Sequence, residues 1–396
     1  MSSSLPARRN LFLLACCQAI GQAGNVMMFT ATALAVSGIL QIHDWATLPV
    51  TMQHLGVMLS VFPAAMLMQR LGRGFGFRVG SVCGMLGSAL CGYGLWSGQF
   101  LLMCLGGLVL GYAVASLQMY RFAAVELVGP GMGAKAISWV TAGGVVAGII
   151  GPTLARATFD KWQPMYTATY AGMVGIHVVV FTLMWFIEFP PPMPKAQRVA
   201  GVQRPLWEIA TQPDFAVAAI AAMIAFGTMS FLMSASPLAI VACGLPQTEA
   251  HWVIFLHVMG MFVPSFFTGN LIQRFGVLNI MLLGAVLLGS GVTVGLHGLD
   301  AWNFRAALML NGVGWNFLFV GATTLVTTTY RPAERGKAQA MNDFLVFGTT
   351  ATCSLLAGLL QNRLGWFPLN YMSIVLIMIA VAAVGWLKLQ RRGAFA

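Results

Sequence analysis

Apolar residues run along almost the whole chain and are interrupted only by short polar segments. Twelve of the apolar stretches are close to the length of about 20 residues that a helix needs to cross a bilayer. They span residues 11–39, 51–69, 79–98, 100–121, 136–158, 165–187, 214–240, 251–272, 277–296, 303–329, 338–361 and 368–388. The pattern therefore predicts an all-α integral membrane protein with twelve transmembrane helices.

The composition excludes a water-soluble domain. Of the 396 residues, 58% are hydrophobic and only 8% are charged, and the mean hydropathy is +0.81. A soluble domain carries about 25% charged residues. We therefore expect the lipid bilayer to be the main partner of the chain's outer surface.

Basic residues gather on one side of the predicted spans. Of the 21 Lys and Arg residues, 17 lie near the chain ends or in even-numbered loops, and the exceptions are Arg156, Lys161, Arg305 and Arg363. Because cytoplasmic loops carry an excess of Lys and Arg, both termini are expected in the cytoplasm. The net charge of +11 is then a topology signal. No basic run or recognition motif accompanies it, so nucleic acid is not an expected partner.

Residues 188–213 form the only long polar, proline-rich segment, and they divide the predicted spans into two sets of six. We expect a six-helix half at 1–187, a cytoplasmic linker at 188–213 and a second six-helix half at 214–396. Repeated halves are common in transporters, where the substrate site lies between them near the middle of the membrane.

The two halves also carry similar loops. MLMQRLGR at 66–73 follows the second predicted helix, and NLIQRFGV at 270–277 follows the eighth. Gln69 and Arg70 therefore correspond to Gln273 and Arg274, and we interpret these residues as parts of two pseudo-symmetric gating loops.

Soft metal ligands lie on the seventh and eighth predicted helices. Met229 and Met233 are four residues apart, as are His257 and Met261, so each pair shares one helix face. Thioether and imidazole groups together suit Cu(I). Methionine also fills irregular cores, and a neutral histidine can bond to a neighbouring helix. Even so, an ionisable residue in a span is a functional candidate.

A second group of candidate ligands could complete the coordination or line the path. His54 and Met58 occupy nearly the same place in the first half as His257 and Met261 do in the second, and Met28 lies on the first predicted helix. Cys243 falls just beyond the outer end of the seventh, where its thiol could pass Cu(I) inward or form a disulfide.

Asp343 is the acidic residue placed deepest in a predicted span, so it is the candidate proton carrier; pairing with Arg335 or Lys337 is the structural alternative. Without proton coupling, the membrane potential alone would supply about 2.3 kcal/mol per charge per 100 mV. The chain has neither a phosphate-binding loop nor a nucleophile with a base and an orienting partner. We expect neither an enzyme nor ATP-driven transport.

The six-plus-six arrangement, the central linker and the repeated loop resemble the major facilitator superfamily over essentially the whole chain. The family's loop motif has an Asp before the Arg, where this chain has Gln69 and Gln273. The usual Asp-centred gating contacts are therefore not expected here.

Within the superfamily, the two ligand motifs resemble those of the CcoA-type copper importers of bacterial inner membranes. This resemblance implies import of Cu(I) by alternating access, with Cu(I) as substrate and no tightly bound cofactor. It also implies a cytoplasmic copper acceptor or chaperone that supplies cytochrome oxidase assembly, and a monomeric protein.

A related group of riboflavin transporters shares the general character of the sequence, so riboflavin or another small aromatic solute is the alternative substrate. Stacking faces and polar contacts for such a solute could come from Trp139, Trp252, Trp315, Phe231, Gln118 and Asn316. A non-transporting membrane sensor or scaffold is a lesser alternative.

Overall fold

The computed structural model describes residues 5–128, 133–191, 204–331 and 334–393, and the regular secondary structure in these ranges is helical. The first seven helices are α1 (Leu5–Gly38), α2 (Leu48–Leu71), α3 (Arg73–Trp96), α4 (Phe100–Gln118), α5 (Tyr120–Glu126), α6 (Gly133–Thr158) and α7 (Thr167–Met184). The others are α8 (Leu206–Ala210), α9 (Pro213–Ala242), α10 (Gln247–Phe262), α11 (Ser265–Phe275), α12 (Val277–His297), α13 (Ala301–Thr327), α14 (Arg335–Leu364) and α15 (Trp366–Gly393).

Eleven helices in the described ranges are long and apolar enough to cross a membrane, and the bent pair α10–α11 makes a twelfth span if the two are taken together. The bend between them is 41° and falls at Pro264, the N-cap of α11. Proline has no backbone N–H to continue the helical ladder, which explains the break. The prediction of an all-helical membrane protein is confirmed.

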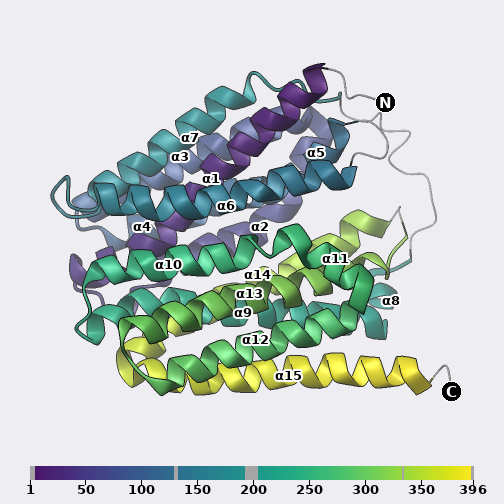
Figure 1. Cartoon of the computed structure of the whole chain (residues 1–396). Helices are drawn as coiled ribbons and strands as arrows, with labels where there is room; N and C mark the ends of the chain where they lie inside the picture. Colours follow the sequence, from purple (N-terminus) through teal and green to yellow (C-terminus); the bar gives the residue numbers. More distant parts are fainter. Residues whose placement is uncertain (1–4, 129–132, 192–203, 332–333, 394–396) are drawn as a thin grey trace.

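The helices form two groups (Figure 1). Helices α1–α7 fill the upper part of the view and α9–α15 the lower part, and both chain termini lie at the same end of the molecule. We call the end of the molecule that holds both termini the terminal end, and the other end the opposite end. Of the expected linker at 188–213, residues 192–203 lie outside the described ranges, so the division into two domains stays a prediction.

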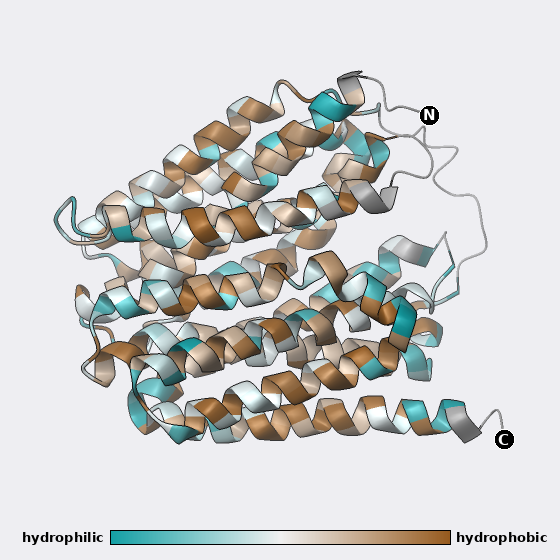
Figure 2. Cartoon of the chain, in the orientation of Figure 1, coloured by the Kyte–Doolittle hydropathy of each residue, from teal (hydrophilic) through white to brown (hydrophobic). Residues whose placement is uncertain are grey.

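Large apolar side chains cover the outer surface. Leu101 is 78% exposed and Val375 61% exposed. In Figure 2 apolar colours run along the helices, and hydrophilic colours gather toward their ends. Apolar side chains on this scale would be unfavourable in water but match lipid tails.

Helix α6 packs closely between the two groups. A Cβ atom at Gly143 would lie 3.0 Å from the Ala15 carbonyl oxygen of α1, and one at Gly148 would lie 2.4 Å from the Met259 methyl group of α10. Small residues let membrane helices approach to this distance. Helix α6 is therefore packed against both α1 of the first group and α10 of the second group.

The repeated loops have the same local conformation. Gly72 follows α2 with φ 91° and ψ 159°, and Gly276 follows α11 with φ 84° and ψ 148°. Both fall in a region that strongly favours glycine. The two halves differ next to these turns, because Arg73 bonds Glu126 at 2.8 Å whereas Val277 occupies the matching place. The four predicted gating residues are exposed beside these turns: Gln69, Arg70, Gln273 and Arg274.

Candidate substrate cavity

A central cavity of about 170 Å³ lies between helices of both groups. It adjoins a terminal-side cavity of about 810 Å³, whose wall includes Thr327, the last residue of α13, and Tyr330 in the following loop. The combined size falls in the range of small-molecule sites, roughly 300–1,000 Å³. Five residues line both cavities: Arg121, Thr141, Ser265, Phe319 and Val320. The two cavities therefore form one path from the terminal end to the centre.

Polar contacts join the two groups at the opposite end. The Tyr166 hydroxyl, before α7, donates to Gln247 Oε1 of α10 at 3.1 Å. Arg363 of α14 bonds Asp44, between α1 and α2, at 2.8 Å. Hydrogen bonding from the Arg363 guanidinium lowers the pKa of the Asp44 carboxyl. The groups are thus held together at the opposite end, and the cavity opens toward the terminal end.

One wall of the central cavity is made of side-chain amides. Gln18, Gln22 and Asn25 line it from α1, and their spacing of four and then three residues places them on one helix face. Gln53 of α2 and Gln118 of α4 extend this wall. Gln53 Nε2 donates to Asn25 Oδ1 at 2.9 Å. We call these five residues the amide wall.

The other wall carries an aromatic cluster. Trp315 and Phe319, one turn apart on α13, stack with ring centroids 5.1 Å apart and planes at 17°. Phe226 of α9 meets both rings edge-on, at 78° and 81°, and Phe347 of α14 packs against Phe226. All four line the cavity. Trp315 Nε1 is buried and has no hydrogen-bond partner in the described part of the chain.

The proposed copper ligands are divided between the cavity and the core. Met229, Met233 and Met261 line the central cavity. His257 is fully buried and is not among the lining residues; its Nδ1 lies 2.8 Å from the Leu308 carbonyl oxygen of α13. Because a carbonyl only accepts, Nδ1 carries the proton and Nε2 is left as an acceptor. Nε2 has no partner among the described residues.

Of the secondary ligand candidates, only His54 lines a described cavity. His54 lines the central cavity. Met28 is fully buried in the core, and the Met58 sulfur packs against Gly348 of α14. Cys243 is the C-cap of α9, where burial raises the pKa of its thiol and so disfavours the thiolate that binds metal.

Asp343 lies in the wall of the terminal-side cavity, together with Arg121. Lys337, one of the partners considered from the sequence, donates instead to the Arg204 carbonyl oxygen. The second partner considered from the sequence was Arg335, whose side chain lies outside the described residues. Arg121 also lines the central cavity, so it stands where the two cavities join.

The aromatic and amide candidates for a flavin are also separated. Trp315 and Gln118 line the central cavity. Trp139 is 61% exposed, Trp252 is also exposed on the outer surface, and Phe231 is buried in the core. Phe226, Phe319 and most of the amide wall were not predicted from the sequence. The signal available for the wall was the helical spacing of amides inside the first apolar stretch.

Asn316 lines the cavity, but its amide is already engaged. Its Nδ2 donates to the Met261 carbonyl oxygen at 2.7 Å and to Ser265 Oγ at 2.6 Å, and its Oδ1 accepts from Thr268 Oγ1 at 2.6 Å. These contacts bridge the α10–α11 break at Pro264. Asn316 therefore holds the bend that presents Met261 to the cavity.

The chain is similar to known membrane transporters, one of which has a named substrate. The Major Facilitator Superfamily model matches residues 218–394. The chain is 35% identical over 397 residues to the riboflavin transporter RfnT of Brucella anthropi, with all of both chains covered. It is 24% identical to two uncharacterized MFS-type transporters of Bacillus subtilis, YddS over 395 residues and YdeG over 394, covering 96% of this chain and 91% and 92% of theirs.

Proposed function

This chain belongs to the major facilitator superfamily of membrane transporters, and we propose that the solute it carries is riboflavin. The observation that carries the proposal is the central cavity, where the aromatic cluster on α9, α13 and α14 shares one space with the amide wall on α1, α2 and α4. The similarity to a riboflavin transporter along the full length supports the same substrate.

The two walls match the two chemical characters of a flavin. The isoalloxazine ring is planar and aromatic, so it stacks on faces such as those of Trp315 and Phe319. Its pyrimidine end carries carbonyl groups and an imide N–H, which pair with carboxamides and with a donor such as Trp315 Nε1. A few polar groups placed in an otherwise apolar cavity are the usual means of fixing a ligand's orientation.

Cu(I) remains a second candidate substrate, because three thioethers line the same cavity: Met229, Met233 and Met261. The copper proposal is weakened by the position of His257. Its Nδ1 is bonded to α13, and the residue does not line the cavity. Copper import would also require a cytoplasmic acceptor, with cytochrome oxidase assembly as the process supplied. Thioethers on a cavity wall equally provide a polarisable apolar surface for an aromatic ring.

We place the protein in a bacterial inner membrane, as a monomer with the terminal end in the cytoplasm. The excess of Lys and Arg near the termini and in the even-numbered loops supports this orientation. The cavity would then open to the cytoplasm. Alternating access would close it there, beside the exposed turns at Gly72 and Gly276, and open the opposite end at the Asp44–Arg363 and Tyr166–Gln247 contacts.

Asp343 is the group we propose for proton coupling. It shares the wall of the terminal-side cavity with Arg121, so a proton on its carboxylate would weaken an attraction between α5 and α14, which belong to different groups of helices. A coupled transporter needs such a contact, whose strength depends on protonation and which spans the moving parts.

The test is uptake of radiolabelled riboflavin by proteoliposomes that contain the full chain. Trp315→Leu removes the main stacking face and should weaken transport at least tenfold, whereas Trp315→Phe keeps a ring and should retain more of it. Trp139→Leu is the matched control, because Trp139 lies on the outer surface; it should transport like the unaltered protein.

Radioactive Cu(I) uptake in the same vesicles separates the two substrates. Riboflavin transport that survives Met233→Leu, with no copper uptake above that of empty vesicles, supports the flavin proposal. Copper uptake that is lost in Met233→Leu, together with no riboflavin uptake by any form, would replace riboflavin with copper.

A further inference from the structure

Gln53 has an unusual position for an amide. It is 2% exposed, lies in the second turn of α2 and lines the central cavity. Its Nε2 donates to Asn25 Oδ1 at 2.9 Å, whereas its Oε1 is buried without a hydrogen-bond partner among the described residues. Buried polar atoms left unpaired are rare and call for an explanation.

In the structure the bond to Asn25 uses one polar group of each amide. Because Gln53 uses its N–H and Asn25 uses its oxygen, the groups that remain are an acceptor on Gln53 and the Nδ2 donor on Asn25. An acceptor and a donor held on neighbouring helices suit a ligand edge that has an N–H beside a carbonyl.

The position of the pair in the path identifies which end of the solute it meets. Gln53 and Asn25 line only the central cavity, which also holds Trp315. The terminal-side cavity has a different wall, rich in hydroxyl and amide groups: Thr323, Thr324, Thr327, Gln339 and Asn342. A polyol chain is best satisfied in that larger, polar space, which leaves the flat ring and its imide edge for the central cavity.

We propose that Gln53 determines specificity by accepting a hydrogen bond from the imide N3–H of the flavin ring, with Asn25 as the residue that positions it. The inference rests on the proposed transport of riboflavin and adds the recognition element to it. A site built to pair with a ligand N–H rejects the analogue that lacks it, because the site's own buried group is then left unpaired.

The experiment compares riboflavin with N3-methylriboflavin, which keeps the ring and the ribityl chain but has no N3–H. Binding of each to the full chain in nanodiscs is followed by quenching of flavin fluorescence. The unaltered protein should bind riboflavin at least tenfold more tightly than the methylated compound. In Gln53→Met the ratio of the affinity for riboflavin to that for N3-methylriboflavin should fall to near one, because riboflavin binds more weakly.

Asn25→Ala, which frees the Gln53 amide to rotate, should lower the ratio part of the way. Gln99→Met is the matched control: it makes the same exchange of side chains at an exposed amide just before α4, outside both cavities, so the ratio should be that of the unaltered protein.

Each other outcome has a distinct meaning. Equal binding of the two compounds by the unaltered protein would overturn the inference without the need for any variant. A ratio that stays above tenfold in Gln53→Met would overturn it as well and assign the discrimination to another group, while riboflavin would remain the substrate. Failure of the unaltered protein to bind either flavin would overturn the proposed function itself.

Discussion

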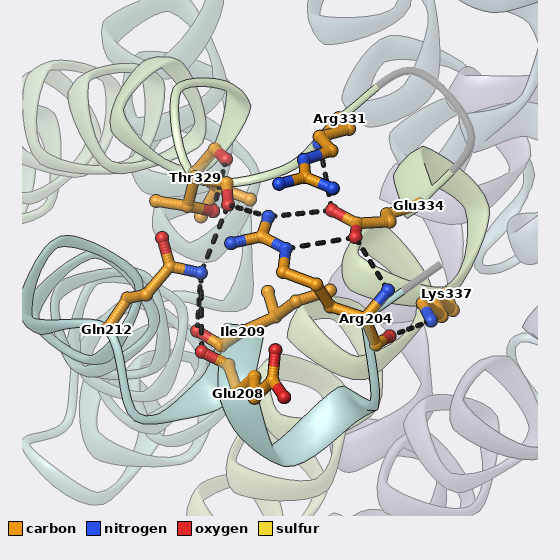
Figure 3. Close-up of polar contacts among 9 residues, drawn as sticks. Arg204, Glu208, Ile209, Gln212, Thr329, Arg331, Glu334 and Lys337 are labelled. Carbon is orange, nitrogen blue, oxygen red and sulfur yellow. Dashed lines mark hydrogen bonds and ion pairs between the residues drawn. The ribbon is translucent and has the colours of Figure 1, made fainter. Parts of the chain in front are cut away.

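The carboxylate of Glu334 has no exposed surface and accepts two hydrogen bonds from the guanidinium of Arg204, at 3.0 Å from Nε and 2.7 Å from Nη2 (Figure 3). The backbone N–H groups of Arg204 and Arg331 also donate to it, at 2.9 and 3.0 Å. Four donors around one carboxylate satisfy its lone pairs, which makes burial of the charge tolerable. The contact joins the segment before α8 to the start of α14.

Further bonds surround this pair in Figure 3. Arg204 Nη2 and Gln212 Nε2 both donate to the Thr329 carbonyl oxygen, each at 3.1 Å, and Lys337 donates to the Arg204 carbonyl oxygen. The chain between Arg204 and α9 is therefore fastened to the loop between α13 and α14. It should move with the second group of helices when the two groups rock.

Acid should weaken this contact. Hydrogen bonding from Arg204, and then from the Arg331 backbone, holds the pKa of Glu334 well below its ordinary value of 4.5. Above pH 4.5 the stabilisation is fully present. As the pH falls below that value the unfolded chain binds a proton before the folded chain does, and the stabilisation is lost.

We therefore expect Glu334→Gln to lower the apparent melting temperature in nanodiscs by several degrees at neutral pH, and the difference from the unaltered protein to shrink between about pH 5 and about pH 3. Glu188→Gln is the control, since Glu188 pairs with Arg9 at the surface with its side chain 78% exposed and such pairs contribute little. A difference that is constant over this pH range would contradict the assignment.

Breaking the Asp44–Arg363 contact should favour opening at the opposite end. In Asp44→Asn the charge attraction between the α1–α2 loop and α14 is removed, so the population that is closed at this end should fall. Spin labels on the two groups, with their separation measured by electron resonance, would show a longer-distance component. Asp300→Asn, which alters an exposed helix cap within α13, should leave the distances unchanged.

Asn316→Leu should cost stability and transport together. The change removes the side-chain donor to the Met261 carbonyl, and an unpaired buried group costs about 1–3 kcal/mol. The Thr268 hydroxyl keeps its bond to the Pro264 carbonyl oxygen at 2.7 Å. A lower melting temperature and weaker riboflavin binding are expected. Asn279→Leu is the control, because its amide bonds the Phe275 carbonyl at an exposed helix start. Normal stability in Asn316→Leu would show that the α10–α11 bend is held by other contacts.

Asp343→Asn should uncouple transport from protons. The variant should lose riboflavin accumulation driven by a pH gradient but retain exchange of labelled for unlabelled riboflavin across the vesicle membrane, because exchange needs no net proton movement. Asp160→Asn, at an exposed site, should keep both. Gradient-driven accumulation at the normal level in Asp343→Asn would remove Asp343 from the coupling mechanism.

Several cavity residues could be predicted from the sequence, and others could not. The ligand motif singled out Met229, Met233 and Met261, and Trp315 was among the candidates for stacking; all four line the cavity, although their roles stay a prediction. Gln53 and Phe226 were missed. When apolar residues surround a single amide or phenylalanine on every side of a helix, the sequence pattern does not indicate whether that side chain points into a cavity or into the packed core.

The sequence by itself determined the helices and their membrane setting, because about 20 apolar residues in a row can satisfy their backbone only as a helix in lipid. It also indicated the two similar loops at 66–73 and 270–277. Only the tertiary structure decided which helix faces line the cavity. His257 and Met261 are one turn apart on α10, yet His257 is bonded to α13 and Met261 lines the cavity. The reason is that all faces of a buried membrane helix are apolar, so its rotation is set by close contacts with neighbouring helices and not by hydrophobic periodicity.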